Sequence, residues 1–262
     1  MKYLKKIDKQ VYHRDIRKGS GYFRALSRSP AHAQHYVLHG LELTAPMAVG
    51  SIADAWITEN IFPDESIIDP KLKTCTIRNG KAFIGPPVLD DIKGMKDAIF
   101  AHPTAGKLLQ KGMAQTSLFG SLNGVDCKAL FDYVREPDRL AVELKTTANG
   151  SPEAFSKSIL NFGMDIQLGL YLSLIEQAFL DINSAVYGHE WQWVWIVVEQ
   201  KAPYSVAVYV PSERLIAQAK EKVWRLTELY KECVENDSWP GYSENIMEID
   251  VPVWAQKGGE YE

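Results

Sequence analysis

Residues 126–147 read DCKALFDYVREPDRLAVELKTT. Two runs of β-branched, aromatic and apolar residues flank the turn-forming sequence REPDR at 135–139, which predicts two strands joined by a short connection. Side chains alternate between the two faces of a strand, so Glu143 and Lys145 project from the same face. Asp132 on the first strand can lie beside them. The stretch therefore predicts two acids and a lysine close together on one sheet.

Two acids and a lysine suit a particular chemistry. Close carboxylates repel each other unless a divalent cation with oxygen ligands compensates them. A neighbouring lysine can hold or polarise an attacking water, so the trio suits metal-assisted hydrolysis of a phosphodiester. More commonly, the residues of a Glu-x-Lys pattern lie on the solvent-exposed face of a strand. The catalytic interpretation therefore needs support from the rest of the chain.

A helix is expected after the second strand. Ser151–Pro152 is a helix-start signal, and Asn161–Gly163 interrupts the helix before a longer one over 164–179. Gln167 and Tyr171 are four residues apart and share one face of that longer helix. The plain alternative is a helix whose polar edge happens to carry these two residues.

Length and composition are those of an ordinary globular protein. The 262 residues predict one domain, and 46% of them are hydrophobic and 24% charged. The longest apolar runs are too short to cross a bilayer, and the basic start at 1–6 has no apolar core after it, so we expect neither a membrane partner nor a secretory signal. The three cysteines are far apart and form no metal-binding pattern. These features predict a cytoplasmic protein.

Charge is distributed unevenly along the chain. Residues 1–28 contain nine Lys or Arg and two Asp, a local net charge of +7, whereas the whole chain carries −4, so the remainder carries −11. A basic arm on an acidic body can meet phosphates while the body stays in solution. A solvated, frayed terminus explains the same charges equally well.

The remaining elements predict an α/β fold. We expect one mixed sheet flanked by helices on both sides, with N-terminal helical and loop elaborations. The expected helices cover residues 22–27, a segment opened by Ser29–Pro30, 44–60, two short pieces within 88–112, and 211–236. Further strands are expected at 114–123, 190–199 and 205–210, a loop-rich excursion at 61–90, and an extended tail at 237–262 that packs on the body.

Asp54 is an acid within the apolar helix expected over 44–60. A lone buried acid is costly unless it is paired or binds a cation. From the pattern alone, an exposed position on the edge of the helix is the preferred interpretation.

The ordered motifs resemble the PD-(D/E)XK nuclease superfamily. Within that superfamily the chain resembles the RecB-like branch, and in it the RecE-type (exonuclease VIII-like) nuclease domain. The motifs that carry this resemblance are LSRSPAHAQHY, TAPMAVGSIADAWI, HPTAGKLLQKG, CKALFDYV, ELKTT and QLGLY. The resemblance covers nearly the whole chain. It implies a restriction-endonuclease-like fold, in which a central mixed sheet is flanked by helices.

The resemblance also implies roles for individual residues. Asp132 and Glu143 would bind the metal, with the backbone carbonyl of Leu144 as a further ligand. Lys145 would orient or activate the water. Gln167 and Tyr171 would hold the lysine, the phosphate or a metal-bound water. The predicted DNA contacts are Arg24, Arg28, Ser29 and Gln115.

Three departures from the family pattern bear on activity. Asp54 stands where the family usually has His, and this reverses the pattern-only interpretation, because Asp is also a ligand for hard metals. Gln115 replaces a frequent Glu. Leu130–Phe131 replaces a common Arg-Pro pair, which removes one possible phosphate contact.

The function implied by the resemblance is a Mg²⁺-dependent 5′→3′ exonuclease on linear double-stranded DNA, with Mn²⁺ as a substitute metal. It would leave 3′ single-stranded tails for an annealing protein, and it would form a trimeric or tetrameric homo-oligomeric ring. A phage or prophage protein in a bacterial host is implied. The alternatives are a catalytically weakened DNA-end-binding or recombination scaffold, and an endonuclease with the same core.

Overall fold

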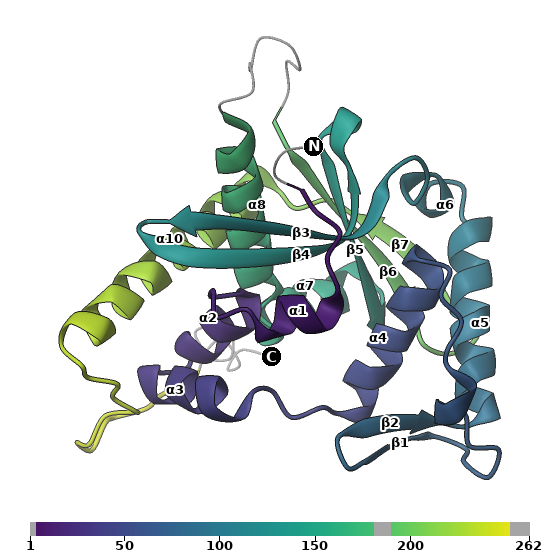
Figure 1. Ribbon diagram of the computed structural model, residues 1–262, viewed down its shortest axis with the longest axis horizontal. Helices are drawn as coiled ribbons and strands as arrows, with labels where there is room; N and C mark the ends of the chain where they lie inside the picture. Colours follow the sequence, from purple (N-terminus) through teal and green to yellow (C-terminus); the bar gives the residue numbers. More distant parts are fainter. Residues whose placement is uncertain (1–3, 181–189, 252–262) are drawn as a thin grey trace, which may run out of the picture.

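A five-stranded mixed sheet forms the centre of the protein (Figure 1). The computed structural model describes residues 4–180 and 190–251. The strand order is β3-β4-β5-β6-β7, and only the β5–β6 pair is parallel. The strands are β3 (Met113–Leu122), β4 (Val125–Arg135), β5 (Leu140–Thr147), β6 (Gln192–Glu199) and β7 (Val206–Tyr209). The predicted restriction-endonuclease-like α/β architecture is confirmed.

The connections follow the turn signals of the sequence. Asn123 and Gly124 join β3 to β4 with positive φ angles of 52° and 78°, as a tight hairpin turn requires. A 3₁₀ turn at Glu136–Asp138 joins β4 to β5. The parallel β5–β6 pair needs a long crossover, which α7 (Pro152–Asn161) and α8 (Met164–Leu180) supply.

Helices cover both faces of the sheet and bury a separate apolar core on each. On one face lie α2 (Ser20–Leu26), α3 (Pro30–His39), α7, α8 and α10 (Glu213–Glu235). On the other face lie α4 (Ala45–Thr58), α5 (Pro86–Ala101) and α6 (Ala105–Leu108). Helix boundaries match their capping signals: Ser29 caps α3 and Ser151 caps α7 through their side-chain oxygens. The tryptophans of β6 are buried in or beside these cores, as expected.

The loop-rich excursion at 61–90 contains a small hairpin. Strands β1 (Cys75–Arg78) and β2 (Lys81–Ile84) pair across the Asn79–Gly80 turn. In the described residues no single helix has the length and apolar character needed to span a membrane. Helices α7 and α8 together have enough length and apolar character, but the chain bends by 75° between them.

The basic N-terminal segment is packed against the body between Lys5 and Lys18. Lys5 exchanges backbone hydrogen bonds with Ser117 of β3, and the Lys18 amide donates to the Asp126 carbonyl. Between these points α1 (Lys9–Arg14) buries Tyr12, whose carbonyl accepts a 2.8 Å hydrogen bond from the Lys128 ammonium. The segment is therefore part of the folded body.

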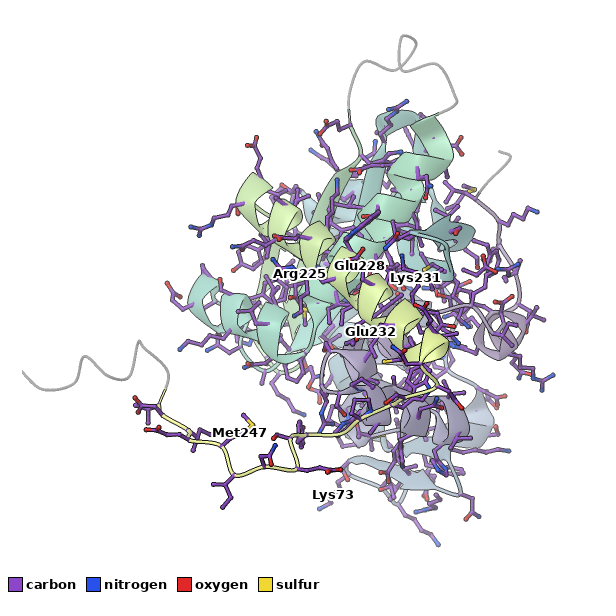
Figure 2. All side chains as sticks on the ribbon, turned by 90° about the vertical axis from the view of Figure 1, so that its left-hand side faces the viewer. Lys73, Arg225, Glu228, Lys231, Glu232 and Met247 are labelled. Carbon is purple, nitrogen blue, oxygen red and sulfur yellow. The ribbon has the colours of Figure 1, made fainter. Side chains whose placement is uncertain are left out.

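The C-terminal tail packs on the body only at its beginning. The Pro240 carbonyl accepts a hydrogen bond from the Ala31 amide, and the Tyr242 ring lies against His32. Beyond that point the chain extends away from the body, as Figure 2 shows around Met247, and Ile246 is fully exposed. The expectation that the tail packs on the body is thus wrong for residues 243–251. The expected packing of 252–262 lies outside the described residues.

Candidate active site

The sheet opens at Asp132. The β4–β5 pairing ends at Tyr133–Val142, so Asp132 and Glu143 face each other without a backbone pair. On the other side of β4, the pairs Ala114–Tyr133 and Thr116–Phe131 bracket Asp132 and leave it unpaired there too. Opposite it, Gln115 has a φ of 50°, a left-handed conformation that is strained for a residue with a side chain. Asp132 therefore lies where β4 separates from β5 and where the β3–β4 pairing is interrupted for one residue.

Carboxylates take over the backbone hydrogen bonds that this opening frees. The Leu144 amide donates to Asp132 Oδ2 at 2.9 Å, and the Asp132 amide lies 3.4 Å from Glu143 Oε1. Buried amides need an acceptor, so these contacts fix the orientation of both carboxylates. The amides that lose their strand partners where the sheet opens are therefore the same groups that position the two carboxylates.

Lys145 and Gln167 both donate hydrogen bonds to the Glu143 carboxylate. Glu143 is fully buried, and its Oε2 accepts from Lys145 Nζ at 3.1 Å and from Gln167 Nε2 at 2.8 Å. Gln167 thus holds the glutamate, whereas the family resemblance implied that it would hold the lysine, the phosphate or a metal-bound water. Tyr171, one helical turn further along α8, is buried, and its hydroxyl lies near Ser20 and the backbone of Leu130.

Helix α4 brings Asp54 to the same place. Its Oδ2 accepts a 2.7 Å hydrogen bond from Gln115 Nε2, and its Oδ1 lies 3.2 Å from the Thr58 hydroxyl. Asp54 is half-buried on the inner side of α4, so the exposed edge position that the pattern favoured is wrong. Gln115, expected at the DNA, is buried against Asp54.

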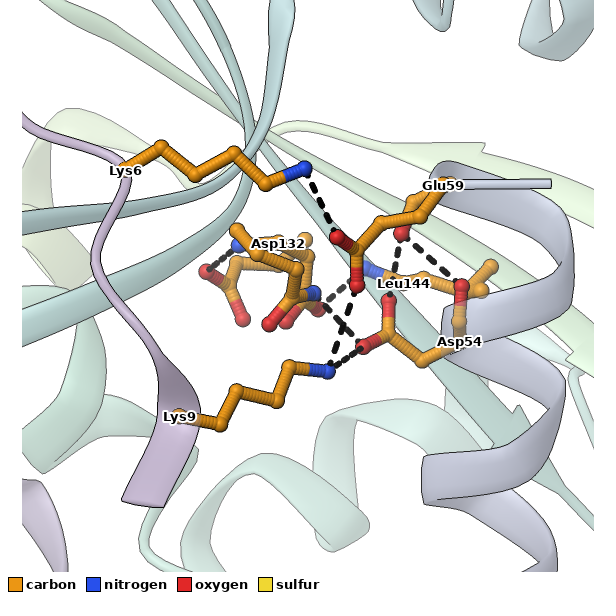
Figure 3. Close-up of polar contacts among 9 residues, drawn as sticks. Lys6, Lys9, Asp54, Glu59, Asp132 and Leu144 are labelled. Atoms are coloured by element: carbon orange, nitrogen blue, oxygen red, sulfur yellow. Dashed lines mark hydrogen bonds and ion pairs between the residues drawn. The ribbon is translucent and has the colours of Figure 1, made fainter. Parts of the chain in front are cut away.

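Three further charged residues join the site, and no sequence pattern predicted them there. Lys6 Nζ lies 2.8 Å from Glu59 Oε2, and Lys9 Nζ lies 3.5 Å from Glu59 Oε1 and 4.0 Å from Asp54 Oδ2 (Figure 3). Glu59 follows the last residue of α4, and the lysines come from the N-terminal segment. The excess of basic residues in that segment was the only signal in the sequence.

Two of the site acids, Asp54 and Glu143, hold their protons unusually tightly. Burial raises the pKa of Asp54 to about 8, and the nearby Asp132 carboxylate adds to the shift, while Lys9 and Lys145 oppose it. Burial, then Asp132, also raises the pKa of Glu143 well above its usual value. Burial alone would lower the pKa of Lys145, but Glu143 and Asp132 outweigh it and raise that pKa. The site therefore concentrates negative charge that a cation would stabilise.

The other predicted DNA-binding residues lie elsewhere. Arg24 donates to the Phe162 carbonyl in the loop before α8, about one turn from Gln167. The Ser29 hydroxyl is engaged in capping α3 and contacts the His32 ring. Arg28 is exposed beside it. No contact joins these three residues to the acids within the described part of the chain.

The donor set fits a divalent metal ion by its chemistry. Asp132, Glu143 and Asp54 offer the carboxylate oxygens that hard cations prefer. Burial raises the pKa of Asp54 and of Glu143, so a cation bound among these groups would stabilise their ionised forms. As the side chains stand, no three His, Cys, Asp or Glu residues in the described ranges are arranged as a metal site.

Comparison with known proteins identifies the family. Residues 19–251 match a family described as a PDDEXK-like domain of unknown function (DUF3799). The chain belongs to this family. Nucleases of the PD-(D/E)XK type generally depend on divalent metal ions, and membership supports a nuclease. The superfamily resemblance is thus confirmed. The RecE-type assignment within it stays a prediction.

One solved structure shows the same fold. A crystal structure of a candidate exonuclease from Eubacterium rectale superimposes with a TM-score of 0.67 at 12% identity, over 98% of this chain and 100% of that one. A crystal structure of SSO0001 reaches a TM-score of 0.31 at 14% identity, over 55% of this chain and 61% of that one. No curated protein matches the chain in sequence.

Proposed function

We propose that this PDDEXK-like protein is a Mg²⁺-dependent exodeoxyribonuclease that degrades linear double-stranded DNA from 5′ ends. The main support is the opening of the sheet at Asp132, which collects Asp132, Glu143 and Lys145 at one point. The description of the Eubacterium rectale neighbour as a candidate exonuclease agrees with the proposal.

Each residue has a role that follows from its contacts. Asp132, Glu143 and Asp54, with the backbone carbonyl of Leu144, would hold the metal, which supplies charge for water activation and for the phosphorane-like transition state. Lys145, beside Glu143, is placed to orient the attacking water and to offset negative charge that develops on the phosphate. Gln167 and Gln115 hold the carboxylates of Glu143 and Asp54 through their amides.

The biological setting is part of the proposal and rests on the RecE-type resemblance. Degradation from 5′ ends would leave 3′ single-stranded tails for a single-strand annealing protein. The protein would act as a trimeric or tetrameric ring around double-stranded DNA.

The first test is degradation of a linear, 5′-phosphorylated duplex with Mg²⁺ or Mn²⁺. We expect the wild type to shorten the duplex, and Lys145→Ala and Asp132→Ala to lower the rate by about 100-fold or more. The matched control is Lys157→Ala, an exposed lysine on α7 that should leave the rate unchanged. A wild type inert with both metals, or site variants as active as the control, would refute the catalytic assignment.

The hydrogen-bonded state of Asp54 favours a second candidate, a DNA-end-binding scaffold with weak catalysis. Asp54 accepts hydrogen bonds on both of its carboxylate oxygens, from Gln115 and Thr58, and these bonds compete with a metal for the same oxygens. A scaffold would shift a labelled duplex in a gel without shortening it. An endonuclease with the same core would also cut closed circular DNA, which an exonuclease leaves intact.

A further inference from the structure

Two lysines from the N-terminal segment converge on one carboxylate beside the site acids. Lys6 and Lys9 contact different oxygens of Glu59, at 2.8 and 3.5 Å, and Lys9 also reaches to within 4.0 Å of Asp54 (Figure 3). The two ammonium groups therefore lie close together at the rim of the acid cluster. Neither the family match nor the motifs of the resemblance include them.

The burial of these groups is asymmetric. The Glu59 side chain is only 7% exposed, whereas those of Lys6 and Lys9 are 63% and 41% exposed. Both lysine side chains are therefore open to solvent while they contact a carboxylate that is not. An ammonium has three donor hydrogens, so each lysine can keep Glu59 and still donate to an anion on its open side.

The backbone holds these lysines in place. Lys5 exchanges two backbone hydrogen bonds with Ser117, at 2.9 and 2.7 Å, immediately before Lys6. Asp8 caps α1 through the amides of Gln10 and Val11, so Lys9 occupies the first position of an ordered helix. A segment fixed on both sides of the two lysines presents them with little loss of entropy on binding.

From these contacts we propose that Lys6 and Lys9 form a phosphate-binding subsite, which holds a backbone phosphate of the nucleic acid next to the catalytic acids. The inference rests on the proposed function for the identity of the ligand. Glu59 keeps both ammonium groups at the rim of the site, so the N-terminal segment serves as one wall of the substrate site.

The charge of the cluster agrees with such a ligand. Its charged groups are Asp54, Glu59, Asp132, Glu143, Lys6, Lys9 and Lys145. A bound divalent cation would displace the protons of Asp54 and Glu143, and the four ionised carboxylates against three lysines then contribute a net charge of −1. One divalent cation would bring this to +1, and one phosphodiester would then return it to zero. Without Lys6 and Lys9, the same complex with the cation and the phosphodiester would carry a net charge of −2.

The experiment measures DNA affinity in a Lys145→Ala background with Mg²⁺, so that cleavage does not interfere. A fluorescent 5′-phosphorylated duplex is titrated at several salt concentrations. We expect Lys6→Ala and Lys9→Ala each to weaken binding by roughly fivefold to tenfold, and to reduce the slope of log K against log salt by about 1. Lys9→Arg, which keeps the charge, should restore most of the affinity.

Lys5→Ala is the matched control, because Lys5 is an exposed lysine of the same segment and contacts β3 through its backbone. It should change neither affinity nor salt slope. Circular dichroism melting shows whether each variant is folded. If the Lys6 and Lys9 variants bind like Lys5→Ala, or if the parent does not bind the duplex, the subsite is refuted.

The outcomes separate this inference from the proposed nuclease activity. A wild type that cleaves DNA, with Lys6 and Lys9 variants that bind normally, refutes the subsite alone. A wild type that does not cleave, with a lysine-dependent affinity and salt slope, refutes the nuclease and keeps the subsite.

Discussion

Asp54 shows how burial and neighbouring charge act on a single residue. Its pKa of about 8 arises first from burial and then from the Asp132 carboxylate. In the unfolded chain the same group has a pKa near 4. Because the folded state holds this proton more tightly, Asp54 favours folding below pH 4, and this contribution is lost as the pH rises through about 8.

The pH dependence of stability tests this assignment. In metal-free protein we expect the melting temperature to fall as the pH rises from about 5 to 9, and Asp54→Asn, which has no proton to lose, to flatten that fall. Mg²⁺ should raise the melting temperature of the wild type most at the alkaline end, where Asp54 is ionised. Thermal melts monitored by circular dichroism with EDTA or Mg²⁺ provide the measurement.

The control for this series is Glu42→Gln, an exposed acid just before α4. Its melting curve should follow that of the wild type across the pH range. If the melting temperature of Asp54→Asn depends on pH as that of the wild type does, Asp54 is not the source of this pH dependence.

At the scale of elements, helix α8 is positioned by a glycine. A Cβ at Gly169 would lie 2.2 Å from the Ala219 carbonyl oxygen of α10, so α10 crosses α8 where no side chain intervenes. Gly169 lies between Gln167 and Tyr171, and the close crossing therefore helps to fix both residues. Helix α4 also contains a glycine, Gly50, but a Cβ there would meet only the Thr146 hydroxyl at 3.4 Å.

Gly→Ala substitutions at these two positions form a matched pair. Alanine is the better helix former, so Gly50→Ala should raise the free energy of unfolding by about 0.5–1 kcal/mol. Gly169→Ala should lower it by roughly 1–3 kcal/mol, because the backbone of α10 must move. Urea denaturation measures both. A Gly169→Ala protein as stable as Gly50→Ala would contradict the close helix crossing.

Local sequence patterns predicted most elements and part of the site. Strand alternation placed Glu143 and Lys145 on one face, and the capping residues Ser29 and Ser151 marked helix starts that the structure confirms. These predictions succeeded because alternation and capping depend on residues a few positions apart. The resemblance to a nuclease family added Asp54 to the predicted site. The pattern of its helix alone had placed Asp54 wrongly, on the exposed edge.

Contacts between distant segments could not be predicted in this way. The left-handed conformation of Gln115 lies at the one-residue interruption of the β3–β4 pairing, and no turn residue marks it. Glu59, Lys6 and Lys9 meet only after α4 and the N-terminal segment have packed on the sheet. Such long-range ion pairs leave no periodic pattern in a single sequence.

At the scale of the whole molecule, the site lies where the two apolar cores meet. One core includes Phe131 and Tyr171, the other Tyr133 and Val142, and the opening of the sheet at Asp132 lies between them. Figure 1 shows β3 and β4 extending beyond the rest of the sheet, with α1 drawn close to β4. Buried acids are tolerated here because packed cores on both faces hold the opened strands in place.

The tail is the part of the described molecule that adds least to this packing. Ile246 and Ile249 are 104% and 93% exposed. Replacing both with serine should therefore change the free energy of unfolding by no more than about 0.5 kcal/mol. Ile196→Ala, at a fully buried position in β6, should cost about 2–5 kcal/mol and is the contrasting variant. Urea denaturation at low protein concentration measures both, and a loss above about 1 kcal/mol in the tail variant would show that this segment packs on the folded body.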